Sequence, residues 1–186
     1  LAIRASKLLG IAALEAFGTK GKARTAVRRT ARKASRTSLR DMRSEAVKIV
    51  RESKRLKARA VRKAIVSRKN RGRGLDDMEW GVDIRGGKTR LIDYPARQTK
   101  KGVSVEINRG QRVLIRGAFI TVVGGHKGVF KRKGAARLPI RELLATRALD
   151  VLNNRRASRA VTRRGRKSFT KTFDRLFPLE LDRIKA

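Results

Sequence analysis

The excess of positive charge is the feature that most constrains what this chain can fold into. Its 186 residues include 51 Lys and Arg but only 15 Asp and Glu, so the formal net charge is +36. Repulsion among so many cations opposes a compact isolated subunit, and it favours a polyanion or an acidic protein as the partner. Residues 1–73 and residues 74–186 are both strongly basic, so the charge belongs to the whole molecule rather than to a detachable tail.

Composition also excludes several classes of protein. The chain has no Cys, which rules out disulfide frameworks, zinc-finger spacing and thiol catalysis. No apolar run reaches the roughly eighteen residues needed to span a bilayer, so no membrane partner is expected. The apolar start is interrupted by basic residues and by Glu15, and it therefore predicts an amphipathic helix over residues 3–17 rather than a signal peptide.

A long basic helix is predicted over residues 22–66. Apolar residues recur there every three to five positions and form one thin stripe, and neither Pro nor Gly occurs between Lys22 and Asn70. A bend is expected near Ser53. Residues 20–73 hold 22 basic and three acidic residues, far less acid than a solvated helix with balanced charge would carry. This imbalance favours contact with phosphates or with an acidic surface.

The apolar period changes from helical spacing to two at Trp80. Residues 80–84 and 88–94 predict strands joined at Gly-Gly, and residues 103–107 and 113–115 predict a second strand pair. Two more β-prone segments surround Gly124-Gly125, where Ala118 to Val123 is the first arm and Val129-Phe130 the second, so another hairpin is expected.

The C-terminal third is predicted to be helical. Pro139 is expected to open an amphipathic helix that ends near Asn154, because proline fits a first helical turn. Residues 155–167 contain seven basic residues and no acid, with a break expected at Gly165. Ser168 is then expected to cap a last helix that carries a stripe of phenylalanines and is interrupted by Pro178.

The predicted fold class is therefore α+β. Basic helices come first (residues 1–73), an antiparallel β region follows (74–137), and a helical region ends the chain (138–186). Together these regions are expected to form one domain competent for assembly.

No catalytic, metal or cofactor site is predicted. Asp76, Asp77 and Glu79 form the only acidic cluster, and without further ligands they favour an exposed turn or a salt bridge over a metal-dependent nuclease. His126 follows Gly124-Gly125 with no partner acid visible in the sequence, so it is expected to be a turn residue. Trp80 is expected to be a core or interface anchor.

Three stretches carry a resemblance to a known family. They are RESKRLKARAVRKAIV (51–66), RVLIRGAFI (112–120) and VFKRKGAARLPI (129–140). Their order resembles the minor tail protein Z family of lambda-like tailed bacteriophages, also described as tail completion proteins. The resemblance implies a non-enzymatic virion protein of the tail or neck, assembled in the host cytoplasm, that helps to join tail to head and to position the DNA end.

The resemblance also implies partners. They are other copies of the chain in a ring of six-fold symmetry, neck and tail proteins such as the tail terminator and the head–tail stopper, and a duplex DNA end. Lys and Arg can hold a duplex by its phosphates without reading bases. Closed rings need contacts between unlike surfaces, which exposed hairpin edges can supply.

Two sets of residues follow as candidate sites. The polyanion-binding set is Arg24, Arg28, Arg29, Arg32, Lys33, Arg36, Arg155, Arg156, Arg159, Arg163, Arg164, Arg166 and Lys167. The subunit-contact set is Phe119, Ile120, Val122, Phe169, Phe173 and Phe177, although the three last phenylalanines fit a core equally well. The alternative function is an RNA-binding structural protein of ribosomal type, whose basic extensions fold on RNA. Histone-like compaction of DNA is a further alternative.

Overall fold

The computed structural model describes residues 2–4, 21–71, 78–145 and 147–185. It combines helices with small antiparallel sheets, so the predicted α+β class is confirmed. The chain forms two compact units. Unit 1 comprises residues 1–46, 65–83 and 155–186, and unit 2 comprises residues 47–64 and 84–154. The units do not follow the three regions predicted along the sequence, because the two ends of the chain share unit 1.

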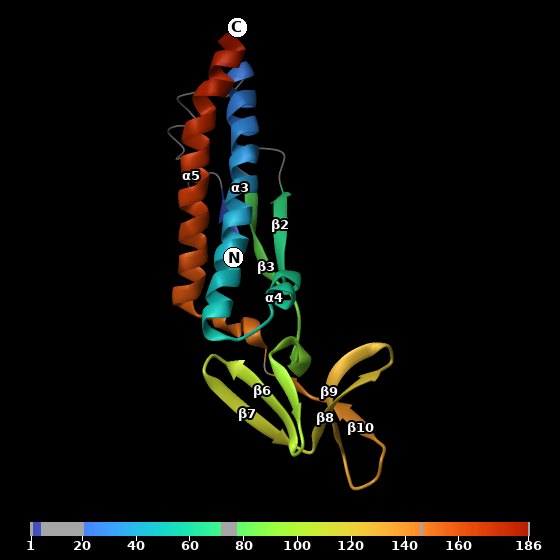
Figure 1. Cartoon of the computed structure of the whole chain (residues 1–186). Helices are drawn as coiled ribbons and strands as arrows, with labels where there is room; N and C mark the ends of the chain where they lie inside the picture. The colour runs from blue at the N-terminus through green and yellow to red at the C-terminus, as the bar shows by residue number, and fades with distance from the viewer. Residues whose placement is uncertain (1, 5–20, 72–77, 146, 186) are drawn as a thin grey trace. The chain divides into compact units, whose positions relative to one another are not determined.

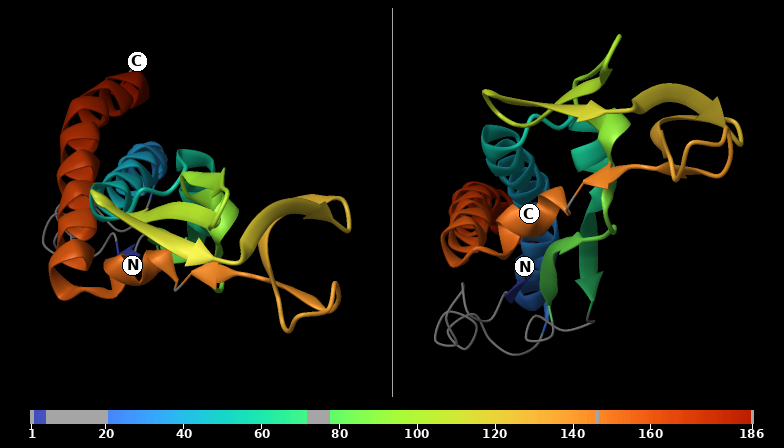
Figure 2. Two further views of the ribbon diagram at one scale, coloured as in Figure 1. Left: turned by 60° about the horizontal axis from the view of Figure 1, so that its bottom comes forward. Right: turned by 90° about the horizontal axis from the view of Figure 1, so that it is seen from below.

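Two long helices form the body of unit 1. These are α3 (Lys22–Ser53), of which residues up to 46 belong to the unit, and α5 (Arg155–Lys185). They lie side by side and run in opposite directions (Figures 1 and 2). The buried face of α3 is rich in small side chains, which lets a neighbouring helix approach closely: Ala26, Thr30, Ala31, Ala34, Ser35 and Ser38.

A three-stranded sheet completes unit 1. Its order is β1 (Ala2–Arg4), β3 (Glu79–Ile84) and β2 (Ile65–Arg71). Trp80 of β3 is fully buried, and its ring stacks on Phe169 of α5 with 4.7 Å between the ring centroids. Phe173 and Phe177 continue the stack along α5. Trp80 is therefore an anchor in the core of this unit, which is one of the two roles predicted for it.

Unit 2 is built mainly from two three-stranded antiparallel sheets. One has the order β5 (Ala96–Thr99), β6 (Gly102–Asn108) and β7 (Gln111–Arg116). The other has the order β10 (Ile140–Glu142), β9 (His126–Arg132) and β8 (Ala118–Val123). The shorter elements are α4 (Ala58–Ala64), β4 (Thr89–Arg90) paired with β11 (Leu144–Ala145), and the 3-10 helices η1 (Leu91–Asp93) and η2 (Ala148–Asn153).

Two of the predicted hairpins are confirmed. In the first, Val105 of β6 lies opposite Val113 of β7. In the second, Val123 of β8 lies opposite His126 of β9, so the connecting turn is Gly124-Gly125. Both of these glycines have positive φ, 56° and 77°, which is the combination that a two-residue type I′ turn requires. The long helix predicted over residues 22–66 is only partly confirmed. Helix α3 ends at Ser53, where only a bend was expected, and after α4 the residues from Ile65 onward form strand β2 instead of helix.

Two predictions for the first half of the chain are wrong. Residues 3 and 4 belong to strand β1 rather than to a helix over 3–17, because they pair with Trp80 and Glu79 of β3; the remainder of that predicted helix lies outside the described residues. Residues 88–94 hold only the two-residue strand β4 followed by η1, and β4 pairs with β11 instead of with the strand before it.

The C-terminal predictions need a larger correction. The amphipathic helix expected from Pro139 is wrong, because Ile140–Glu142 pairs with β9 and the residues after it form β11 and η2. Helix α5 starts at Arg155 and continues through Gly165, Ser168 and Pro178 without the predicted break, cap or interruption. The chain thus ends in one long helix rather than in three short ones.

Candidate functional site

The first predicted basic patch, residues 24–36, lies on the outer face of α3. The apolar and small side chains of this segment are buried, so its cations must point the other way. Arg24, Arg29, Arg32, Lys33 and Arg36 are exposed, and Arg28 is half-buried. The stripe predicted from sequence is therefore the core face, and the opposite face is almost entirely cationic.

The second predicted patch, residues 155–167, lies on α5 in the same unit. All seven cations are exposed, while Val161 and Gly165 between them are buried. Helical continuity through Gly165 matters here, because it places Arg163, Arg164, Arg166 and Lys167 on one rigid element rather than on a loop.

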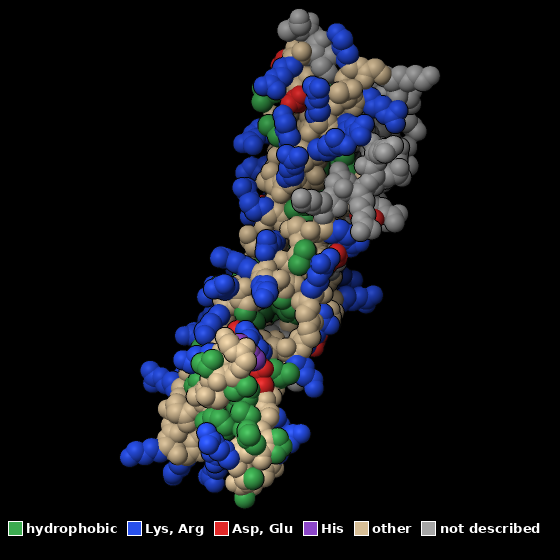
Figure 3. Space-filling view, turned by 90° about the vertical axis from the view of Figure 1, so that its right-hand side faces the viewer, with side chains coloured by type: hydrophobic (Ala, Val, Ile, Leu, Met, Phe, Trp, Pro, Cys, Tyr) green, Lys and Arg blue, Asp and Glu red, His purple; other side chains and the backbone are tan. Residues whose placement is uncertain are grey.

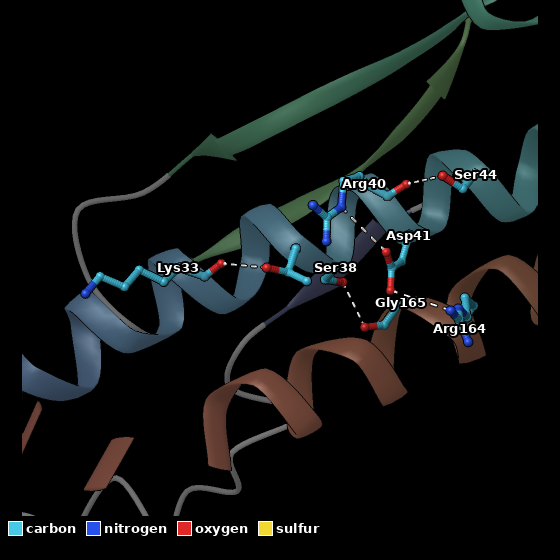
Figure 4. A network of polar contacts seen from close by, with 8 residues as sticks. Lys33, Ser38, Arg40, Asp41, Ser44, Arg164 and Gly165 are labelled. Atoms are coloured by element: carbon cyan, nitrogen blue, oxygen red, sulfur yellow. Dashed lines mark hydrogen bonds and ion pairs between the residues drawn. The ribbon is translucent and has the colours of Figure 1, made fainter. Parts of the chain in front are cut away.

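The antiparallel pairing of α3 and α5 determines how the two patches are related. Lys33 Nζ lies 2.5 Å from Oε1 of Glu180, near the end of α5. Arg164 lies 3.8 Å from Asp41, further along α3. The two patches therefore belong to one pair of helices but occupy successive levels along it. Figure 4 shows the contact between Arg164 and Asp41.

Two carboxylates reduce the positive charge of this helix pair locally. Glu180 is largely buried, and the hydrogen bond from Lys33 lowers its pKa below the ordinary value of 4.5. Asp41 lies between Arg40 and Arg164, each at 3.8 Å. The charges of Lys33 in the first patch and of Arg164 in the second are therefore offset in part by a neighbouring acid.

The predicted subunit-contact residues fall into two groups. Phe169 and Phe173 are buried in the core of unit 1, and Phe177 stacks on Phe173 with 5.2 Å between the ring centroids. The other three lie on β8, at the edge of its sheet: Phe119 and Ile120 are half-buried, whereas Val122 is 62% exposed.

Exposed apolar side chains lie on the hairpins of unit 2. They include Val113 and Leu114 of β7 and Val122 and Val123 of β8. Figure 3 shows one face on which apolar side chains gather beside widely distributed Lys and Arg. Strands β7 and β8 both lie at the edge of a sheet.

The described residues contain no cluster of three or more metal-binding side chains. Asp76 and Asp77 lie outside the described residues, and Glu79 forms the expected salt bridge, to Arg68 at 3.5 Å. His126 is the first residue of β9, and its Nε2 lies 3.4 Å from Oε2 of Glu142. Glu142 is an acidic partner that the sequence did not reveal, because it comes from the strand β10 that had been predicted as helix.

Among the helices that the structure describes, none combines the length and apolarity that crossing a bilayer requires.

Sequence reasoning missed one basic cluster. In unit 2, the guanidinium of Arg109 donates a hydrogen bond of 2.7 Å from Nε to the carbonyl oxygen of Arg51, 58 positions away. The basic run around Lys54 is visible in the sequence, but its meeting with a distant turn is a tertiary contact that no local pattern signals.

Comparisons of the chain with protein-family models, with curated proteins and with solved structures each found no match. The resemblance to the minor tail protein Z family therefore depends on the three stretches of sequence that carry it, and it stays a prediction.

Proposed function

We propose that this chain is a non-enzymatic structural protein of a tailed-phage virion that acts in tail completion near the head–tail junction. In this role it forms a ring with further copies of itself, contacts neck and tail proteins such as a terminator or stopper, and holds a duplex DNA end. The proposal rests on the family resemblance together with the charge arrangement of unit 1.

One observation carries the proposal. The two basic patches, more than a hundred residues apart in sequence, lie on one pair of helices whose apolar faces are buried and whose cations face outward. Arg guanidinium groups bind phosphate oxygens with two parallel hydrogen bonds, so such a surface suits a phosphate backbone. Among the described residues, the aromatic side chains of α5 are engaged in the core of unit 1: Phe169 and Phe173 are buried, and Phe177 stacks on Phe173. Binding that ignores base sequence is therefore expected.

Ring formation is the second part of the proposal. The exposed Val113 and Leu114 on edge strand β7, and the exposed Val122 on edge strand β8, offer apolar area at sheet edges where a further strand can pair. A neighbouring copy that covers these edges with a different surface makes a head-to-tail contact, and such contacts form a closed ring when the rotation between copies closes.

Salt-dependent binding of a short DNA duplex tests the polyanion surface. The variant is Arg29→Gln, Arg32→Gln and Arg36→Gln, three exposed cations of the first patch. Arg28 and Lys33 are left intact because they are, respectively, half-buried and bonded to Glu180. If each arginine contacts one phosphate, the slope of log K against log salt should become less steep by about 3.

The matched control removes the same charge from unit 2. Lys100, Lys101 and Lys127 are exposed, and their replacement by Gln should leave the salt slope within about 1 of the parent value. Equal losses in both triple variants would mean that net charge alone drives binding.

Two further measurements test the rest of the proposal. Tighter binding of folded RNA than of duplex DNA would favour the ribosomal alternative. A mass that corresponds to a monomer, both with and without duplex, would contradict the ring.

A further inference from the structure

A small basic pocket opens in unit 2, where the end of α3 meets the turn between β6 and β7. Its volume is about 260 Å³. Five cations and two apolar side chains line it, with no acid among the described residues of its wall: Arg51, Lys54, Arg55, Leu56, Lys57, Pro95 and Arg109. None of these cations belongs to the two patches on unit 1.

The backbone around the pocket is held in place by hydrogen bonds within unit 2. Lys54 forms an isolated antiparallel bridge with Asn108. The next amide, that of Arg55, donates to the carbonyl of Ile107 at 3.0 Å, and the amide of Lys57 donates to the carbonyl of Asp93 at 3.1 Å. The backbone of these pocket residues is therefore positioned before any ligand arrives, which reduces the ordering cost of binding.

Neutral oxygens orient the cationic side chains. Lys54 Nζ donates to Oδ1 of Asn108 at 2.6 Å, and Lys57 Nζ donates to the carbonyl of Ile92 at 2.9 Å. A carbonyl oxygen fixes the direction of an ammonium group without cancelling its charge. Arg55 does face a carboxylate, that of Glu106, but the 3.9 Å separation is longer than a charge-assisted hydrogen bond. Most of the positive charge of the pocket is therefore retained.

Stabilisation of the α3 C-terminus explains the position of only some of the cations that line the pocket. Cations near the last turn of a helix interact favourably with its dipole, and Arg109 does so directly by bonding the carbonyl of Arg51. Lys54 and Lys57 instead donate to Asn108 and Ile92, which lie outside the helix. The presence of both lysines in the lining of one pocket therefore needs a different explanation.

We propose that this pocket binds a phosphate group. Sites for drug-sized ligands usually span about 300–1,000 Å³, so the smaller volume here suits one or two phosphate groups rather than a whole nucleotide. The five Lys and Arg residues of the lining carry N–H donors of the kind that phosphate oxygens accept. The phosphate can come from a free phosphate or diphosphate, or from the backbone of a nucleic acid. The proposal does not depend on the phage role, because it concerns unit 2 and its own contacts.

Calorimetric titration of the full chain with pyrophosphate tests the site. In the variant Lys54→Gln/Lys57→Gln, each glutamine keeps an N–H donor for the neutral oxygen while the charge is removed. Binding of pyrophosphate should weaken about tenfold or more, because hydrogen bonds to charged groups contribute most of the affinity in such a site. The control Lys100→Gln/Lys101→Gln loses the same charge from the exposed turn before β6, and its affinity should change by less than about twofold.

Amide NMR of the parent chain gives a second readout that needs no variant. Pyrophosphate should shift the resonances of residues 51–57 and 109 before those of 24–36. If a short DNA duplex displaces the pyrophosphate, the natural source is a nucleic acid backbone; if it does not, the source is free phosphate. Unchanged affinity in Lys54→Gln/Lys57→Gln, equal weakening in the control, or shifts confined to other residues would overturn the proposal.

Discussion

The indole Nε1 of Trp80 donates a hydrogen bond of 2.9 Å to Oγ of Ser38. Ser38 in turn donates to the carbonyl oxygen of Gly165 at 2.8 Å, so one serine connects β3 through α3 to α5. All three residues are buried. Trp80 is 42 positions from Ser38 in sequence, and Gly165 is 127 positions from it. These two hydrogen bonds, called the Ser38 relay below, link β3 to the two helices that carry the basic patches.

Replacing Ser38 by alanine should destabilise the protein by about 1–3 kcal/mol, because it leaves the Trp80 N–H and the Gly165 carbonyl buried without this partner. Urea denaturation measures the change. The control is Ser44→Ala on the same helix, since the exposed Ser44 donates only to the carbonyl of Arg40 one turn earlier (Figure 4). That change should stay within about 0.5 kcal/mol. Equal losses in the two variants would contradict a special role for the relay.

Gly102 at the start of β6 should not tolerate a side chain. Its φ is +149°, and an added Cβ would lie 2.2 Å from the carbonyl oxygen of Ile115 on β7. Gly102→Ala should therefore cost at least about 3 kcal/mol and weaken the β6–β7 hairpin, as thermal unfolding would report. Gly87 is the control, because no atom lies within 4 Å of its added Cβ and its φ is not positive; Gly87→Ala should be neutral or slightly stabilising.

Tyr94 should ionise only above the ordinary tyrosine value of 10.0. Burial in unit 2 raises the pKa of its phenol, and Asp93 adds to the effect, while the neighbouring Thr89 side chain opposes it. The raised pKa means that this group contributes stability at neutral pH and that the contribution is lost as pH rises through the folded value. Because Tyr94 is the only tyrosine, ultraviolet titration of the phenolate reports it directly. Adding denaturant should return the midpoint to about 10; a native midpoint at or below that value would contradict the burial.

The elements that were predicted correctly depend on local chemistry. Gly124-Gly125 can adopt two successive positive φ angles, so these two turn residues are enough to predict the β8–β9 hairpin. The buried stripe of α3 is likewise a local pattern, since helical spacing alone places its small residues on one face. The two basic patches could be predicted from the charge of their segments, because exposed cations on a helix need no distant partner.

The elements that were predicted wrongly depend on distant partners. Residues 140–145 carry an apolar spacing compatible with either helix or strand, and pairing of Ile140 with Arg132 of β9 decides for strand. Gly165 would break an isolated helix, but here it lies buried with Ser38 bonded to its carbonyl, so packing overrides propensity. The basic pocket of unit 2 was missed for the same reason, because Arg109 reaches it from a separate hairpin.

The pairing of Lys33 with Glu180 should make stability depend on pH in the acid range. The hydrogen bond from Lys33 lowers the pKa of Glu180, so its contribution is present above the unfolded value of about 4.5 and is lost as pH falls through the lower folded value. In Lys33→Met this part of the acid destabilisation should disappear, and the NMR titration midpoint of the Glu180 carboxyl should rise. Lys48→Met is the control, because Lys48 and Glu52 are both highly exposed and 3.9 Å apart, so their pair contributes little. Identical acid profiles for the two variants would mean that Lys33 is an ordinary surface cation, and it would then belong with Arg29 and Arg32 as a candidate phosphate contact.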